Sequence, residues 1–300
     1  MKIYEYSENI STDFSAAVIA LGLFDGVHKG HRALLSAAKK EAEKLNLPLA
    51  VFTFFSESEL PKSASRLYST SVKNELLEKE GVDCVIYSDF KRISNVTAED
   101  FVNDILIKKL KLQLAVTGFD FKFGKGRAGD TKLLSQLVES AGKKCLLIPD
   151  EIFSGNKVST SLIKELLSQG RMNFANELLG EPYFIEGEII KGDGRGKMLG
   201  LPTVNISLQN KPFLKLGVYR SEVLIGEKSY TGLTNIGNCP TFEEREVHAE
   251  TFILDFDEKV YGETARISLL DFLREEKKFN TKDELINQVK KDINSVKEKL

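Results

Sequence analysis

The chain contains few tryptophan, cysteine, methionine and histidine residues. Its 300 residues include no tryptophan and only three cysteines, three methionines and three histidines. Cys84, Cys145 and Cys239 are odd in number and far apart, which argues against a disulfide framework. We expect the first two to be buried thiols within strand-like runs.

Long apolar runs and an excess of one charge are also absent. No stretch of about 18 apolar residues occurs, and the acidic start MKIYEYSENISTDF lacks the apolar segment of a signal peptide. The 42 Lys and Arg residues nearly balance the 44 Asp and Glu residues, so the surface does not favour polyanions. We therefore expect a cytoplasmic protein that binds neither membranes nor nucleic acids.

Short apolar runs alternate with amphipathic segments in the first half. Because these runs are hydrophobic along their length, they are typical of strands covered on both faces of a sheet. The runs span residues 17–23, 49–55, 83–88, 114–119 and 144–149. The clearest helix is expected over residues 29–45, with an apolar face of His31, Leu34, Leu35, Ala38, Ala42 and Leu45. This order predicts an α/β domain with a doubly wound parallel sheet and ligands at the carboxyl ends of the strands.

The pattern changes after the helical segment 160–180 and Pro182. Beyond this point apolar and polar residues alternate between turn residues, which predicts an antiparallel sheet or small β-barrel. The tail 281–300 is expected to form a closing amphipathic helix. The apolar face of that helix consists of Leu285, Val289, Ile293 and Val296. We predict two domains, residues 1–182 and 183–300.

Two of the three histidines lie in one short stretch, GLFDGVHKGH, directly after the first apolar run. His28 and His31 are three residues apart at the start of the predicted helix, where backbone N–H groups and the helix dipole favour an anion. Gly30 between them would let a phosphate approach the backbone. A metal site would need a third ligand, and none is near in the sequence. We interpret the pair as a phosphate clamp, in which each N–H donor lowers a barrier by about 2–4 kcal/mol.

This stretch resembles the H-x-G-H motif of nucleotidylyltransferases, in the longer form found in bacterial bifunctional riboflavin kinase/FAD synthetases. In that family the two histidines stabilise the α-phosphate of ATP as pyrophosphate leaves. The segment 118–130 resembles the family's G-x-D-F-x-F-G-x-x-R-x-G-D motif, which holds flavin and nucleotide. Residues 158–164, VSTSLIK, resemble I-S-S-T-x-I-R with lysine in place of the closing arginine, which costs a bidentate phosphate contact worth about 1–2 kcal/mol. The resemblance implies ligand contacts at Gly22, Phe24, Asp25, Gly30, Asp120, Phe121, Arg127, Ser159, Thr160, Ser161 and Lys164.

The second half contains a glycine-rich stretch, KGDGRGKMLGLPTVNI. It is not a Walker A loop, because methionine rather than Ser or Thr follows Lys197. Its backbone could still wrap phosphates, and Thr203 and Asn205 point the same way on an extended segment, where they could bind Mg²⁺. A plain glycine-rich hairpin is the alternative. The stretch resembles the riboflavin kinase module, which implies magnesium ligands at Thr203 and Asn205 and nucleotide contacts at Gly192, Gly196, Lys197 and Gly200.

Three further segments resemble the same module. LTNIGNCPTF is similar to its N-I-G-x-x-P-T-F motif. AETFILDFDEKVYGE is similar to E-x-x-x-L-D-F…Y-G, which implies that Glu250 activates the riboflavin 5′-hydroxyl. We expect Glu250 to open a strand on its buried face, in line with Phe252, where loss of water makes a carboxylate a stronger base; a solvent-facing acid is the alternative. FLREEKKF implies a flavin contact at Arg274, and His248 matches no motif.

The resemblance implies two consecutive ATP-dependent steps. The C-terminal domain would phosphorylate riboflavin to FMN, and the N-terminal domain would adenylylate FMN to FAD with release of pyrophosphate. Both steps are expected to require Mg²⁺. The alternatives are an enzyme with only one active half and a flavin-binding regulatory protein on the same scaffold. We expect riboflavin, FMN and ATP as partners, and a monomer or weak homo-oligomer.

Overall fold

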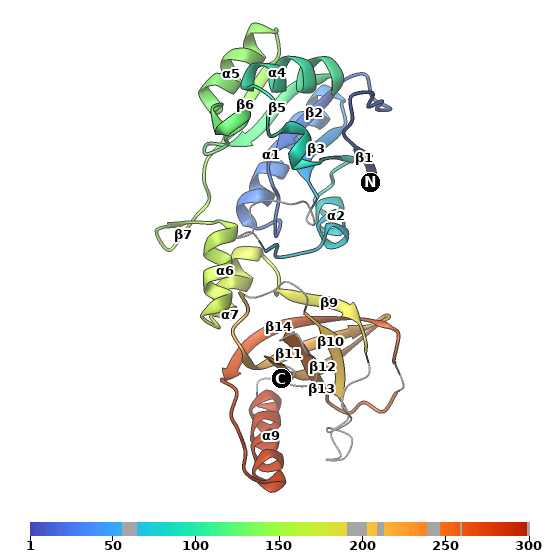
Figure 1. Ribbon diagram of the computed structural model, residues 1–300, viewed down its shortest axis with the longest axis vertical. Helices are drawn as coiled ribbons and strands as arrows, with labels where there is room; N and C mark the ends of the chain where they lie inside the picture. Colours follow the sequence, from blue (N-terminus) through green and yellow to red (C-terminus); the bar gives the residue numbers. More distant parts are fainter. Residues whose placement is uncertain (56–64, 191–202, 209–212, 239–246, 259, 299–300) are drawn as a thin grey trace. The chain divides into compact units, whose positions relative to one another are not determined.

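The computed structural model describes residues 1–55, 65–190, 203–208, 213–238, 247–258 and 260–298. These form two compact units, Met1–Thr160 and Ser161–Leu300, both visible in Figure 1. The segment 161–182, which the sequence analysis assigned to the first domain, belongs to the second compact unit; the boundary at residue 182 stays a prediction. Among the described residues, no helix combines the length and the apolar character needed to cross a bilayer.

The first unit is built on a six-stranded, wholly parallel sheet (Figure 1). The strand order is β1-β4-β3-β2-β5-β6, so the chain proceeds from β2 to one side and returns to β5 on the other. This reversal next to β2 confirms the doubly wound sheet and marks where ligands bind in such folds. The strands are β1 (Lys2–Glu5), β2 (Ala17–Leu21), β3 (Leu49–Phe54), β4 (Cys84–Ser88), β5 (Leu112–Gly118) and β6 (Lys144–Ile148).

Helices cover both faces of this sheet, which explains why every residue of β2 is buried. Helix α1 packs against β2, β3, β5 and β6, while a π-helix, η1, and α5 share a core cluster with the alternate residues of the strands. The helical segments are α1 (Lys29–Leu45), α2 (Thr70–Lys79), α3 (Phe90–Ile93), α4 (Ala98–Asp100), η1 (Phe101–Lys109), η2 (Lys125–Arg127) and α5 (Thr131–Ser140). The predicted helix 29–45 is confirmed, although Leu45 in its last turn is exposed. A short hairpin, β7 (Ile152–Phe153) and β8 (Asn156–Lys157), follows β6.

The two described cysteines differ in burial. Cys84 is buried in β4, and burial raises the pKa of its thiol to about 12. Cys145 in β6 is only partly buried. The expectation of a buried thiol therefore holds only in part there, because the residues of the edge strand β6 are covered less completely. Cys239 lies outside the described residues.

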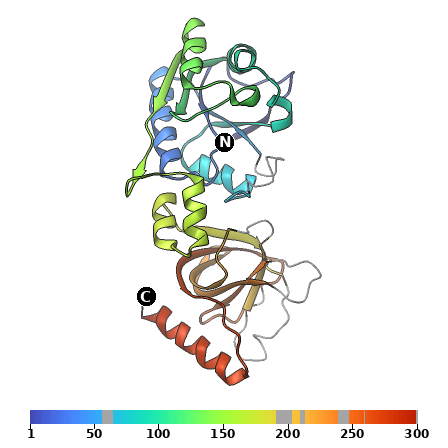
Figure 2. The ribbon, with the colours of Figure 1, turned by 60° about the vertical axis from the view of Figure 1, so that its left-hand side comes forward.

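The second unit begins with helices α6 and α7 and continues into an antiparallel sheet in the order β10-β13-β12-β11-β14-β9. A bridge between Ile190 and Asn205 brings the two ends of this order together, so the sheet forms a nearly closed barrel. Figure 2 shows the barrel from the side with α9 beyond its last strand. The predicted β-barrel and closing helix are confirmed. The bounds are α6 (Thr160–Ser168), α7 (Met172–Leu179), β9 (Phe184–Glu188), β10 (Thr203–Ser207), β11 (Gly217–Ile225), β12 (Lys228–Asn238), β13 (Val247–Ile253), β14 (Thr264–Arg274) and α9 (Lys282–Lys297).

The barrel strands β12 and β13 carry different side chains on their two faces. Inside, the hydroxyl group of Thr234 in β12 lies 2.7 Å from that of Ser221 in β11 and 2.9 Å from that of Thr251 in β13, so the three form a buried hydrogen-bonded chain. Outside, Leu233 and its cross-strand neighbour Phe252 pack in a cluster with Val296 of α9. Helix α9 therefore covers an apolar part of the outer barrel face.

Candidate active sites

The loop after β2 carries the two histidines predicted to bind phosphate. It leaves the carboxyl end of β2, and Phe24, Gly26 and Val27 adopt φ angles of 50°, 84° and 39°. Left-handed backbone is strained for Phe and Val and concentrates at functional sites. A Cβ on Gly22 would lie 3.1 Å from the buried Phe24 ring. Gly22 thus makes room for that ring.

Hydrogen bonds hold this loop from three directions. The carboxylate of buried Asp25 accepts from the Leu67 backbone N–H at 3.0 Å, and the Asp25 carbonyl accepts from the Thr160 hydroxyl at 3.0 Å. The Thr53 hydroxyl donates to the Leu23 carbonyl at 2.9 Å. Asp25 and Thr160, both predicted ligand contacts, therefore shape the loop that presents the histidines.

The imidazoles of His28 and His31 stack on each other, with ring centroids 3.7 Å apart and planes inclined by 17°. His28 is the N-cap of α1, and its Nδ1 accepts the His31 backbone N–H at 3.3 Å. Nδ1 is thus an acceptor, so a neutral His28 carries its proton on Nε2. A Cβ on Gly30 would lie 3.3 Å from the His28 ring. The His28 ring therefore lies beside the place that a side chain would take at Gly30, and the approach of a phosphate to this backbone stays a prediction.

Burial keeps both rings uncharged. His28 is 5 % exposed, and burial lowers its pKa to about 4, with a smaller contribution from the positive charge of Lys157. The pKa of His31 lies well below its usual value, chiefly through burial and then through the charges of His28 and Lys73. His31 Nδ1 is buried and has no hydrogen-bond partner among the described residues. At neutral pH the two imidazoles therefore offer N–H donors without a formal charge.

The lowered pKa of His28 predicts a loss of stability in acid. The folded-state pKa lies below the unfolded value of 6.5, so the unfolded chain binds more protons between them. The contribution is complete above pH 6.5 and falls by about 3 kcal/mol at pH 4. The variant His28→Asn keeps an N-cap side chain without this titration. Its free energy of unfolding, measured by denaturant titration at each pH, should decline less from pH 7 to pH 4 than that of the wild type. An equal decline in both proteins would contradict the prediction.

The second predicted binding loop follows β5, the neighbour of β2. Asp120 pairs with Lys157 of β8 at 2.6 Å, and Lys157 also contacts Asp150 at 2.7 Å. The Phe121 ring stacks on that of Phe123 at 5.6 Å, whereas Arg127 has a φ of 60° and is exposed. The structure thus joins Asp120 to a lysine that the sequence analysis did not single out. The sequence signal that could have identified Lys157 is its position directly before the VSTSLIK segment.

The VSTSLIK residues divide between the two compact units. Ser159 and Thr160 end the first unit, where the Thr160 hydroxyl contacts the Asp25 carbonyl. Ser161 and Lys164 belong to the second unit. Within it, the Lys164 Nζ lies 5.7 Å from the centroid of the Phe213 ring. The predicted phosphate contact of Lys164 stays a prediction.

The described residues of the second predicted site lie together on the outer face of β10 and β13. The Thr203 hydroxyl donates to a Glu250 carboxylate oxygen at 2.8 Å. Asn205 lies directly opposite Glu250 in the β10–β13 register, so its side chain shares the same face. The structure therefore brings together the predicted metal ligands and the predicted base. Gly192, Gly196, Lys197 and Gly200 lie outside the described residues.

Glu250 does not lie where the sequence analysis placed it. It occupies the middle of β13 and not its start, and it is half-buried on the outer face with Phe252. The interior face belongs to Ala249, Thr251 and Ile253, which are buried. The expected burial of Glu250 is wrong because Phe252, taken as an interior residue, instead packs beneath α9.

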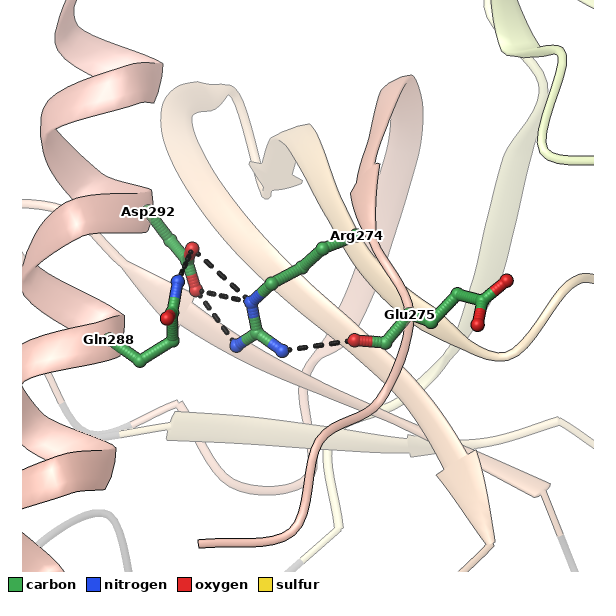
Figure 3. A network of polar contacts seen from close by, with 4 residues as sticks. All are labelled: Arg274, Glu275, Gln288 and Asp292. Atoms are coloured by element: carbon green, nitrogen blue, oxygen red, sulfur yellow. Dashed lines mark hydrogen bonds and ion pairs between the residues drawn. The ribbon is translucent and has the colours of Figure 1, made fainter.

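Arg274, the predicted flavin contact, is engaged in a polar network with α9 (Figure 3). Its Nε and Nη2 donate to the Asp292 carboxylate at 3.0 and 2.8 Å, and its Nη1 donates to the Glu275 carbonyl at 3.1 Å. Gln288 adds a hydrogen bond of 2.9 Å to Asp292. Arg274 thus fastens the closing helix to β14, and its contact with flavin stays a prediction.

Breaking this pair is expected to destabilise the second unit. Asp292 is 7 % exposed, and removing one partner of a buried pair leaves an uncompensated charge. We expect Arg274→Ala to lower the free energy of unfolding by about 3 kcal/mol, measured by calorimetry. The matched control is Lys228→Ala, which removes an exposed ion pair of 3.0 Å with Glu258 and should leave the free energy of unfolding nearly unchanged. Equal losses in both variants would contradict a special role for the Arg274 network.

Comparison with known proteins matches each half of the chain to a family model. The family model described as FAD synthetase matches residues 10–162, and the model described as riboflavin kinase matches residues 179–300. The bifunctional riboflavin kinase/FMN adenylyltransferase of Escherichia coli is 34 % identical over 299 residues, covering 97 % of this chain and 96 % of the relative. The protein of the same description from Bacillus subtilis is 34 % identical over 296 residues, covering 94 % and 92 %.

The whole fold also has a counterpart among solved structures. A crystal structure from Streptococcus pneumoniae, titled as a macrolide-efflux protein, matches with a TM-score of 0.89 and 30 % identity and covers 99 % of both chains. The arrangement of elements is therefore shared from end to end, in a protein whose title names another activity. The two family models match the two halves in turn, and the relatives match nearly the whole chain. The chain belongs to the family of bifunctional riboflavin kinases/FMN adenylyltransferases.

Proposed function

We propose that the loop between β2 and α1 binds the phosphates of ATP during adenylylation of FMN. An oxygen of the FMN phosphate attacks the α-phosphorus of ATP, the bond to the β-phosphate oxygen breaks, and pyrophosphate leaves. Neutral His28 and His31 donate N–H hydrogen bonds to the α-phosphate oxygens, where negative charge builds up in the transition state. The observation that supports this assignment is the stacked, uncharged pair at the carboxyl end of the central strand.

In the second unit, Glu250 accepts the proton of the riboflavin 5′-hydroxyl as its oxygen attacks the γ-phosphorus of ATP. ADP leaves, and FMN is the product. The supporting observation is the cluster of Thr203, Asn205 and Glu250 on one barrel face. Glu250 receives a hydrogen bond from Thr203, which orients the carboxylate for this proton transfer.

The same cluster fits a magnesium ion. Thr203 and Asn205 supply neutral oxygen atoms on one face of β10, next to the carboxylate of Glu250. Magnesium is commonly held by few protein oxygens together with substrate phosphates. When bound, the ion would neutralise charge on the ATP phosphates. Thr203 and Asn205 would hold it there.

The test of the combined function is product analysis by chromatography after incubation with riboflavin, ATP and Mg²⁺. We expect FMN first and FAD later, together with ADP and pyrophosphate. FMN that accumulates without FAD would indicate a single active half. Riboflavin that binds but stays unchanged would indicate a regulatory protein. Cytoplasmic location and a monomer or weak homo-oligomer stay predictions from the sequence.

A further inference from the structure

The N-I-G motif of the second unit has no role in the proposed function. The N-I-G segment lies in β12, where Asn235 is the direct cross-strand neighbour of Glu250 on β13. Glu250 in turn is the direct neighbour of Asn205 on β10. These three side chains form one row across three adjacent strands, and each is half-buried on the outer face. We call Asn205, Glu250 and Asn235 the polar row.

The residues on either side confirm which face the polar row occupies. Thr234 and Ile236, which flank Asn235, are fully buried inside the barrel. Leu233, two residues before Asn235, packs on the outer face with α9. Successive residues of a strand point to opposite faces. The amide of Asn235 and the carboxylate of Glu250 therefore lie on the same side of the sheet.

The carboxylate of Glu250 has different neighbours on its two sides. On the β10 side, the Thr203 hydroxyl donates to it at 2.8 Å. On the β12 side, the neighbour is Asn235, whose side chain has two N–H donors and one carbonyl acceptor. A second donor on the β12 side would stop the carboxylate from rotating freely and would keep its free lone pairs directed at one position.

Gly237, two residues after Asn235 on the same face, leaves space for another acid. A Cβ at Gly237 would lie 2.1 Å from a carboxylate oxygen of Glu276 and 3.2 Å from the Asn235 side-chain nitrogen. Glu276 thus reaches over β12 beside Asn235. An amide at this position borders Glu250 on one side and Glu276 on the other without adding a third negative charge.

We propose that Asn235 is a positioning residue of the riboflavin kinase reaction. Its amide donates to the Glu250 carboxylate from the β12 side and fixes the orientation in which that carboxylate meets the riboflavin 5′-hydroxyl. This inference rests on the proposed role of Glu250 as the base. Asn235 itself contacts neither the transferred phosphoryl group nor the hydroxyl.

The test compares Asn235→Ala and Asn235→Ser with Thr231→Ala in the full-length chain. Thr231 lies on the same outer face of β12 but opposite Glu222, away from the polar row. We expect Asn235→Ala to lower kcat for FMN formation by about tenfold to a hundredfold, with KM for ATP and riboflavin and the conversion of supplied FMN to FAD unchanged. Asn235→Ser keeps one hydroxyl donor and should recover part of the rate, and Thr231→Ala should match the wild type.

A double variant separates this inference from the role of Glu250. If Asn235 acts only through Glu250, adding Asn235→Ala to Glu250→Gln should cause no further loss of kcat. A wild-type kcat for Asn235→Ala, or a further loss in the double variant equal to that of the single variant, would overturn the positioning role while Glu250 remains the base. A wild-type kcat for Glu250→Gln would overturn the proposed base and the inference together. If Asn235→Ala does not fold, the same comparison is made with Asn235→Ser.

Discussion

Glu250→Gln is expected to form FMN from riboflavin about 10²–10⁴-fold more slowly than the wild type, while it still converts supplied FMN to FAD. Glutamine retains the size of the side chain and can still accept the hydrogen bond from Thr203 through its carbonyl oxygen. It cannot accept the proton of the riboflavin hydroxyl at neutral pH. The loss should therefore fall on kcat and not on the fold. Separate rate measurements for the two half-reactions, with flavins resolved by chromatography, check both parts.

A matched control for this variant is Glu258→Gln. Glu258 is an exposed carboxylate of the same unit and pairs only with Lys228 and Tyr230 among the described residues. Its neutralisation changes the net charge by the same amount but leaves the polar row intact. FMN formation should stay at the wild-type rate. Equal losses in the two variants would show that charge and not position explains the effect, and the role of Glu250 as base would then fail.

The variant His31→Leu is expected to lower the rate of FAD formation from FMN by about 10²–10³-fold and to leave FMN formation unchanged. Leucine fills much of the space beside the rings of Phe24 and His28, which lie 5.1 and 3.7 Å from that of His31. It has no N–H to donate to a phosphate oxygen. Because the wild-type ring is neutral, the loss reflects a hydrogen bond and not a formal charge. Stopped assays with FMN and ATP measure the rate.

The companion variant His31→Gln tests the chemistry of the donor. Glutamine restores an N–H group at a similar distance from the backbone, so it should recover part of the lost rate. Thermal unfolding of both variants controls for damage to the stacked pair. If His31→Leu forms FAD at the wild-type rate, the phosphate clamp is wrong. If Gln and Leu variants are equally slow although folded, His31 acts through its ring packing and not as a donor.

Much of the architecture follows from local sequence pattern. Runs such as 49–55 are apolar along their length because helices cover both faces of the sheet. This pattern can be recognised in the sequence without knowledge of the individual contacts. The helix 29–45 repeats its apolar residues at helical spacing, and that face packs against β2 and β3. Strand β1 was missed, because the residues KIYE are largely exposed and pair only through a long-range contact with β4.

The sites were located by motif, but their geometry depends on contacts that no local pattern contains. The His28 ring caps α1 because left-handed backbone at Phe24 and Val27 turns the loop back on the helix. The pairing of Lys157 with Asp120 joins segments more than 30 residues apart. The face of Glu250 was misjudged because β13 has apolar residues on both sides, so alternation alone does not distinguish them.

The two faces of β12 and β13 have a consequence for how this enzyme half can change. Inside the barrel these strands contribute Thr234 and Thr251, and outside they contribute Asn235 and Glu250. Inserting or deleting one residue in β13 would exchange Glu250 with Thr251, burying an acid in the interior and moving a hydroxyl to the catalytic surface. Evolution of this half can therefore proceed by replacement of side chains, whereas strand length is constrained by folding and catalysis at once.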